Sequence, residues 1–292
     1  MESNTAQVYL NIVGTVIRIT TDQEIFPKDL GKLSLFTINP RTFDLDLIIH
    51  AVDKLPEPQG ICEYRDHGRM DFRTESGYIA YLGSVGITLD GAYMRITKTG
   101  SVSCALIKRS AFINTITSRV ILEAMDLERH TIENDCFLFH CSYIIHHDKA
   151  ILFTAPSGTG KSTQADLWNT HRNAEIINGD RAAVAITESG ALAMGLPFSG
   201  SSGISKNISR RICAIVSLKQ ASETHIRKLN SLEAFRKVWE GCAIPLGREN
   251  LIEKCYDNVM KIIETVPIYS LECTPDESAV LALESVLKGE GL

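Results

Sequence analysis

The first 108 residues alternate between short apolar runs and polar breaks, which is typical of β-strands joined by turns. The runs are rich in β-branched and aromatic side chains, and Gly, Pro, Asp or Asn separates one run from the next. The pattern predicts a mainly β N-terminal region over residues 1–130. The expected strands are VYLNIVGTVIRIT, FTINP, DLDLIIHAV, GYIAYLG, GAYMRITKTG and VSCALIK.

From Ser110 to His130 the apolar positions recur every three or four residues. This spacing predicts an amphipathic helix, because it places the apolar side chains on one face. The stripe consists of Phe112, Ile113, Ile116, Val120, Ile121, Ala124 and Leu127. We expect this helix to lead into a second domain, residues 131–292.

The second domain alternates strand and helix signals, which predicts a mixed, β-rich α/β fold. Its first two runs, CFLFHCSYII and KAILFTA, flank the polar turn HHDK and predict a β-hairpin. Further strands are expected at AEIIN, VAIT, ALAMG, RICAIVSL, THIRKL and PIYSLEC. Helices are expected from Gly160 to about His171, from the Asn230–Glu233 capping box to about Gly241, over 248–265, and from Thr274-Pro275-x-Glu277 to about Lys288.

The amino-acid composition limits which binding partners and which cellular compartment are expected. Thirty basic and 35 acidic side chains give a net charge of -5, and no basic block is present, so nucleic acid is not an expected partner. The eight cysteines are scattered without a C-x-x-C pair, which indicates reduced core thiols and a cytoplasmic location. The longest apolar run, about 136–145, is too short to span a bilayer, so no membrane association is expected.

A phosphate-binding loop is predicted at A-P-S-G-T-G-K-S, residues 155–162. Gly158 and Gly160 allow the backbone to turn its N–H groups inward around an anion. A helix that starts at Lys161 adds its positive end and an ammonium charge, and Ser162 offers a hydroxyl to Mg²⁺. The expected nucleotide-binding residues are Ser157, Gly158, Thr159, Gly160, Lys161, Ser162 and Thr163.

One position departs from the G-x-x-x-x-G-K-[ST] pattern, because Ala155 replaces the first glycine. Alanine is acceptable there if its φ is negative, and an apolar strand before the loop with a helix after it is the context that the motif requires. The alternative is an ordinary Gly-Ser connection. That alternative does not explain a lysine followed by two hydroxyl residues at a helix start.

Asp180 ends the next strand, 18 residues after Ser162. One helix and a turn fill that interval, and a right-handed crossover would place the two parallel strands side by side with their carboxyl ends together. We therefore expect Asp180 to lie beside the loop as a metal ligand. The alternative is a turn residue, since Asn-Gly-Asp also favours a turn.

These segments resemble the HPr kinase/phosphorylase group and its relatives among the phosphoenolpyruvate-carboxykinase-like P-loop proteins. The likeness covers roughly residues 136–290, and implies for the second domain a P-loop kinase core of that type. Its strongest parts are FHCSYI with His140, APSGTGKST with Lys161 to Thr163, and NGDRAAV with Asp180 and Arg181. The loop LPFSGSSGISKN and the closing VPIYSLECTPDESAV look like those of shorter kinase-like relatives that modify peptides or small hydroxyl compounds.

The likeness has one departure at the strand end. Bacterial HPr kinases carry two adjacent aspartates before the arginine, one for the metal and one as the base, whereas this chain has Gly179-Asp180-Arg181. One acid of the pair is therefore missing. The identity of the base, Asp180 or His140, and the reverse phosphorolytic activity stay open.

The resemblance implies an ATP-dependent kinase that uses Mg²⁺ and transfers the γ-phosphate to a serine-type hydroxyl of a peptide, protein or small molecule. Lys161, Asp180 and His140 are the expected catalytic residues, and Ser162 and Asp180 the expected Mg²⁺ ligands. Residues 1–130 would then choose the substrate. Self-association is also implied, since HPr kinases tend to form hexamers.

Two other functions remain open for the same site. The missing acid at Gly179 fits a nucleotide-binding regulatory protein that does not turn over ATP. A carboxykinase-like phosphotransferase acting on a metabolite is the other alternative. A base at His140 competes with the simpler interpretation of a hydrogen-bonded core histidine.

Several weaker candidates surround the site. The loop 195–207 is rich in Gly and Ser and suits a mobile cover over phosphates or substrate, or an ordinary surface loop. Lys206, Arg210, Arg211 and Arg248 are candidate phosphate contacts or solvated charges, and His146 with His147 is a metal pair or an exposed turn.

Overall fold

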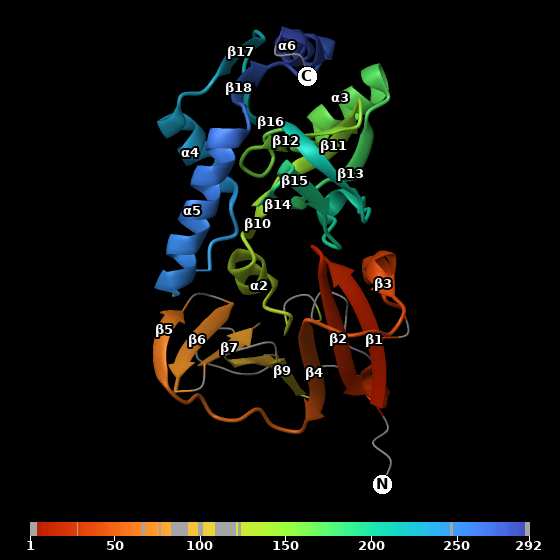
Figure 1. Ribbon diagram of the computed structural model, residues 1–292, viewed down its shortest axis with the longest axis vertical. Helices are drawn as coiled ribbons and strands as arrows, with labels where there is room; N and C mark the ends of the chain where they lie inside the picture. The colour runs from red at the N-terminus through yellow and green to blue at the C-terminus, as the bar shows by residue number, and fades with distance from the viewer. Residues whose placement is uncertain are drawn as a thin grey trace. The chain divides into compact units, whose positions relative to one another are not determined.

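The computed structural model describes residues 5–27, 29–65, 68–75, 77–82, 93–98, 102–108, 121, 124–245 and 248–289 (Figure 1). The chain divides into two compact units, Met1–Leu127 and Glu128–Leu292. The helix expected over 110–130 lies mostly outside the described residues, and its described end belongs to α2 (Leu127–Glu133). Within the described chain, no helix combines the length and apolar character needed to cross a membrane.

The first unit contains a nine-stranded sheet in the order β3-β1-β2-β4-β9-β8-β7-β6-β5. The pairs β2–β4 and β4–β9 are parallel, and the other neighbours are antiparallel. The strands are β1 (Thr5–Ile12), β2 (Thr15–Asp22), β3 (Thr37–Ile38), β4 (Leu45–Val52), β5 (Ile61–Arg65), β6 (Arg69–Thr74), β7 (Gly77–Leu82), β8 (Tyr93–Lys98) and β9 (Val102–Lys108). Two 3-10 helices, η1 (Gln23–Ile25) and η2 (Gly31–Phe36), accompany them.

The mainly β character predicted for this region is confirmed, with two differences in detail. The first apolar run is two strands, because Val13 and Gly14 both take positive φ (57° and 78°) and form a tight turn between β1 and β2. The β5–β6 hairpin was not predicted. Charged and apolar residues alternate in RMDFRT, which is the pattern of a strand with one solvated face, so the sequence did contain a signal for this hairpin.

The second unit contains a second nine-stranded sheet, in which β10-β14-β15-β16-β12-β11-β13 follow one another while β18 pairs with β16 and β17 with β18. Its strands are β10 (Cys136–His140), β11 (Ser142–His146), β12 (Lys149–Thr154), β13 (Glu175–Asn178), β14 (Arg181–Thr187), β15 (Gly190–Gly195), β16 (Ser209–Gln220), β17 (His225–Lys228) and β18 (Ile268–Cys273). Its other helices are α3 (Lys161–Arg172), η4 (Gly200–Ser202), α4 (Ser231–Gly241), α5 (Glu249–Thr265) and α6 (Glu277–Gly289).

Helices cover both faces of this sheet, which confirms the mixed α/β class. Along β12, Ala150 and Leu152 pack with residues of α4 and α5, whereas Ile151 and Phe153 pack with residues of α3 and α6. Because β12 is buried on both faces, its sequence is a continuous apolar run instead of an alternating one.

Local helix signals largely match the structure. The capping box at α4 is present, since the Asn230 side chain accepts the Glu233 N–H and the Glu233 side chain accepts the Asn230 N–H. At α6 the carboxylate of Asp276 accepts the Ser278 N–H at 2.9 Å, so the start of the helix is held by Asp276, where the sequence pattern pointed to Thr274.

The prediction that the strands before and after α3 lie side by side is wrong. β11 lies between β12 and β13 and is antiparallel to both. The β11–β12 hairpin causes this arrangement, because its two-residue turn at His147 and Asp148, with φ of 46° and 61°, folds β11 back against β12. β12 and β13 still run in the same direction, so both carboxyl ends reach the same edge of the sheet.

Candidate active site

The loop between β12 and α3 has the backbone geometry of an anion cradle. Gly158 has φ 78°, and Gly160, which precedes the helix, has φ 114° and ψ 19°. A side-chain carbon at either position would meet nothing within 4 Å, so these glycines are needed for their backbone angles and not for space. The Gly160 carbonyl accepts the Gln164 N–H at 2.9 Å, and the first N–H groups of a helix have no carbonyl partner within it.

Lys161 is the first residue of α3, and it folds back under the loop. Only 7% of the residue is exposed. Its ammonium donates to the Ala155 carbonyl at 2.9 Å and to the Pro156 carbonyl at 3.4 Å. Burial lowers its pKa, and the negative charge of Asp180 opposes that shift. The helix start therefore carries a buried cation directly beneath the glycine turn.

The other predicted nucleotide-binding residues surround this cation. Ser157 and Gly158 are exposed in the loop, Thr159 and Gly160 are half-buried, and Ser162 and Thr163 are exposed in the first turn of α3. All of them belong to one loop and one helical turn. The hydroxyl of Ser162 is thus open to solvent.

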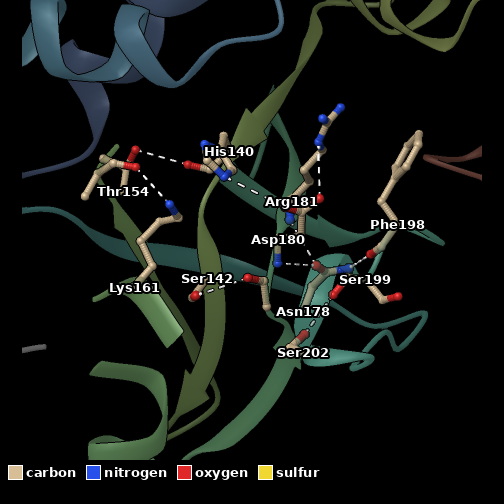
Figure 2. Close-up of polar contacts among 12 residues, drawn as sticks. His140, Ser142, Thr154, Lys161, Asn178, Asp180, Arg181, Phe198, Ser199 and Ser202 are labelled. Atoms are coloured by element: carbon tan, nitrogen blue, oxygen red, sulfur yellow. Dashed lines mark hydrogen bonds and ion pairs between the residues drawn. The ribbon is translucent and has the colours of Figure 1, made fainter. Parts of the chain in front are cut away.

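His140, Asp180 and Arg181 meet at the ends of β10 and β14 (Figure 2). His140 is paired with Arg181 in the ladder of these strands, and its Nε2 lies 3.8 Å from Oδ1 of Asp180. Arg181 Nε lies 3.3 Å from Oδ2 of the same carboxylate. The hydroxyl of Thr154, the last residue of β12, donates to the His140 carbonyl at 3.1 Å and so ties this group to the start of the glycine loop.

The charges of Lys161 and Asp180 act on His140 in opposite directions. Burial contributes most to the lowered pKa of His140, the positive charge of Lys161 lowers it further, and Asp180 raises it. The structure therefore brings the three expected catalytic residues into one electrostatic neighbourhood. A histidine with a pKa below 6.5 is neutral at pH 7 and can accept a proton.

This coupling predicts how the His140 pKa responds to substitutions. Lys161→Met removes the nearby cation and should raise the pKa, whereas Asp180→Asn removes the nearby anion and should lower it. NMR titration of the imidazole measures both shifts. Lys261→Ala, on the exposed face of α5, is the control and should leave the titration unchanged. Equal pKa values in all four proteins would mean that the three groups are not neighbours.

Asn178, the last residue of β13, is a site residue that sequence reasoning missed. Its side chain is fully buried. Its amide nitrogen donates to the carbonyls of Leu196 at 2.9 Å and Phe198 at 2.5 Å, and its amide oxygen accepts the N–H groups of Asp180 at 2.8 Å and Arg181 at 2.9 Å. One amide thus holds both the Asp180 turn and the loop 195–207. The motif Asn-Gly-Asp predicted a turn but not this second set of contacts.

The side chain of Ser202 fills the space beside Gly179, the position of the missing second acid. A side-chain carbon added to Gly179 would lie 2.2 Å from Oγ and 2.6 Å from Cβ of Ser202. An aspartate cannot occupy this position unless the loop moves. The absence of a second carboxylate is therefore matched by the packing of the loop.

The packing predicts a compensating pair of substitutions. Gly179→Ala should lower the free energy of unfolding by about 1–3 kcal/mol, because the new methyl collides with Ser202. Ser202→Gly in the same chain should restore most of that loss. Urea unfolding of the single and double variants measures the coupling, with Gly289→Ala as a control expected to change stability by less than about 0.5 kcal/mol, since nothing lies within 4 Å of that position. Purely additive effects would contradict the contact.

Several hollows border the glycine loop. One, of about 400 Å³, is lined by Gly158, Thr159, Gly160, Thr163, Gln164, Leu218, Lys219, Gln220, Ala221, Cys273, Thr274 and Pro275. Another, of about 260 Å³, is lined by His140, Thr154, Ala155, Pro156, Ser217, Leu218, Lys237, Glu240 and Gly241. A third, of about 390 Å³, shares Gly158, Thr159 and Gln220 with the first and Pro156, Ser217 and Lys237 with the second, so the hollows adjoin one another along the loop from α3 to His140.

The weaker candidate residues lie away from the glycine loop or form ion pairs with other residues of the chain. Lys206 pairs with Glu175 at 2.8 Å. Arg210 pairs with Asp148 at 2.6 Å in the hairpin turn, at the end of β12 that is opposite the glycine loop. The rings of His146 and His147 contact each other at the same end, with centroids 4.0 Å apart and a tilt of 51° between their planes. Arg211 is exposed near that turn, and Arg248 is buried at the start of α5.

Comparisons with known proteins add no functional argument. No protein-family model matches the chain, and no curated protein matches it. Among solved structures, the Hpr(Ser) kinase/phosphatase from Coxiella burnetii aligns with 53% of this chain and 93% of its own, at a TM-score of 0.30 and 12% sequence identity. A likeness this small leaves the function to be argued from the site itself.

Proposed function

We propose that this chain is an ATP-dependent phosphotransferase that transfers the γ-phosphate of Mg-ATP to a serine-type hydroxyl. The observation that carries the proposal is the turn between β12 and α3, where two left-handed glycines precede a helix whose first side chain is a buried lysine. Backbone N–H groups, the positive helix end and the ammonium of Lys161 all favour a polyphosphate in this loop.

The larger hollow supports a nucleoside next to that phosphate site. Its volume of about 400 Å³ is adequate for a base and ribose, and the loop glycines form one of its walls. The amides of Gln164 and Gln220, on α3 and β16, border it and can hydrogen-bond a base or sugar. The smaller hollow, which includes His140, is left for the acceptor.

The oxygen donors at the site fit a magnesium ion. The Asp180 carboxylate and the Ser162 hydroxyl are suitable ligands, and within the described residues no group of three or more His, Cys, Asp or Glu could form a self-contained metal cage. That donor set suits Mg²⁺, which usually keeps waters and binds through one or two protein ligands plus substrate phosphates. When bound, the ion would neutralise phosphate charge.

Different residues of the chain perform different parts of the phosphoryl transfer. Lys161 stabilises the charge that develops on the phosphates, and the loop N–H groups hold the polyphosphate in place. The acceptor oxygen forms a bond to the γ-phosphorus as the bond to the bridging oxygen of ADP breaks. Its proton passes to Asp180 or to the neutral imidazole of His140, which lie 3.8 Å apart.

The direct test is release of ADP from Mg-ATP, with and without candidate acceptors. Label from the γ-phosphate should appear in a serine-containing peptide, a protein or a small hydroxyl compound, and the comparison of a peptide with free serine identifies the acceptor class. We propose that the N-terminal unit selects this acceptor. Failure to bind Mg-ATP at all would reject the proposal.

A second candidate function has one specific observation in its favour. Ser202 fills the space beside Gly179, so Asp180 stands there without an adjacent acid. This arrangement fits a nucleotide-binding regulatory protein that holds ATP without turnover. Binding of Mg-ATP with neither ADP release nor transfer to any acceptor would favour this candidate over the kinase.

A further inference from the structure

The loop that follows β15 is fastened to the Asp180 turn at both of its ends. At its start, Asn178 holds the carbonyls of Leu196 and Phe198. At its end, the Lys206 N–H donates to the Ile177 carbonyl at 3.0 Å, and Asn178 forms an isolated β-bridge with Ser205. The segment between these anchors cannot move away from the turn without breaking buried hydrogen bonds.

The tip of this loop lies against Asp180, one of the two candidate bases. Gly200 has φ 52°, and a side-chain carbon there would lie 3.0 Å from Oδ1 of Asp180. Ser202 packs over Gly179 on the other side of the same turn. Figure 2 shows Ser199 and Ser202 beside Asn178 and Asp180. The loop therefore brings Gly200 against the Asp180 carboxylate, and Ser201 is the next residue along the chain.

The three serine hydroxyls differ in their solvent exposure and hydrogen bonding. Ser202 Oγ donates to the Ser199 carbonyl at 2.8 Å and accepts the Ile204 N–H at 3.2 Å, so it is engaged in the turn. Ser201 is exposed, and its hydroxyl makes no hydrogen bond to the described part of the chain. Ser199 is half-buried and Ser202 is engaged in the turn, so Ser201 is the exposed, unbonded hydroxyl of the tip.

We infer that the chain phosphorylates its own loop, with Ser201 as the main acceptor. This inference rests on the proposed kinase function and names an acceptor for that same site. The Ser201 oxygen attacks the γ-phosphorus of ATP, the bond from that phosphorus to the bridging oxygen breaks, and ADP leaves. The hydroxyl proton passes to the Asp180 carboxylate and then to water.

Tethering favours this acceptor over one from solution. An acceptor on a loop of the same chain, one residue from a glycine that contacts Asp180, reacts as part of one molecule, and such placement can replace a very high concentration of free acceptor. Arg181, 3.3 Å from Asp180, adds a cation beside the incoming phosphate. The reaction within one molecule should therefore be first order in the chain.

The experiment uses the full chain with Mg-ATP labelled at the γ-phosphate, followed by mass spectrometry of the digested protein. We expect about one phosphate per chain, on the peptide that contains Ser201, at a rate per chain that does not change over a tenfold range of protein concentration. Ser201→Ala, and the triple Ser199, Ser201 and Ser202→Ala variant, should lower labelling at least tenfold. Ser189→Ala, in the exposed turn after β14, is the matched control and should label normally.

Measurements of Mg-ATP binding and of ADP release distinguish a failure of this inference from a failure of the proposed function. If the wild-type chain binds Mg-ATP and phosphorylates an added acceptor while its loop carries no phosphate, this inference fails and the proposed function stands. If it does not bind Mg-ATP, both fail. A rate per chain that rises with protein concentration, or label at a serine outside the loop, would also overturn the inference. Because Ser201 is exposed, Ser201→Ala should fold normally, and thermal unfolding checks this.

Discussion

Lys161→Ala should lower turnover of Mg-ATP by about 100-fold or more. The ammonium is buried beneath the glycine turn and donates to the carbonyls of Ala155 and Pro156, so it is already positioned beside the phosphate site. A preorganised cation of this kind acts mainly on the charge of the transition state, where one contact is typically worth roughly 3 to 4 kcal/mol. The rate of ADP release measures the loss.

Two further variants make the Lys161 result specific. Lys161→Met keeps the buried stem without the charge, so it should lose turnover to the same extent and remain folded, because removal of a buried charge need not destabilise a protein. Lys261→Ala, with an exposed side chain on α5, should keep normal turnover. Near-normal ADP release by Lys161→Ala would refute the assignment of this loop as the phosphate site.

Asn178→Ala should lower the free energy of unfolding of the second unit by about 3 kcal/mol, because several buried backbone groups lose their partner at once. The four contacts involve two carbonyls of the loop and two N–H groups of the Asp180 turn. The amide is fully buried, so water cannot replace it without a change in packing. The loop 195–207 and the Asp180 turn should therefore lose their hydrogen bonds to Asn178 together.

Tryptophan fluorescence during urea unfolding measures this effect, since both tryptophans, Trp168 and Trp239, lie in the second unit. Asn169→Ala is a matched control, because its side chain makes a single hydrogen bond, to the Ala174 carbonyl at 2.9 Å, from an exposed position. It should cost about 1 kcal/mol or less. Equal losses of unfolding free energy in the two variants would contradict the role of Asn178 in holding both the loop 195–207 and the Asp180 turn.

The glycine loop could be predicted from the sequence because its signals are local. The backbone angles of Gly158 and Gly160, the start of α3 at Lys161 and the capping box of α4 depend on residues within one or two turns of chain. The mixed α/β class followed from the same kind of signal, the change from strand spacing to helix spacing. Local propensity and final structure agree at these places.

The remaining features depend on residues far apart in the sequence. The insertion of β11 between β12 and β13 is set by which hairpin edge pairs with β13, and the strand patterns contain no information on that choice. The contacts of Asn178 with Leu196 and Phe198, and of Gly179 with Ser202, span about 20 residues of sequence. A single sequence gives no signal for such contacts, so the hydrogen bonds that hold the Asp180 turn become apparent only in the three-dimensional structure.

Isothermal titration calorimetry of the full chain with Mg-ATP tests the central claim most directly. We expect saturable heat with one site per chain, and at least a tenfold loss of affinity in Lys161→Met, because that substitution removes the cation beneath the glycine turn. Absence of binding heat from the wild-type chain, or equal affinity in the two proteins, would contradict a polyphosphate site in the loop between β12 and α3.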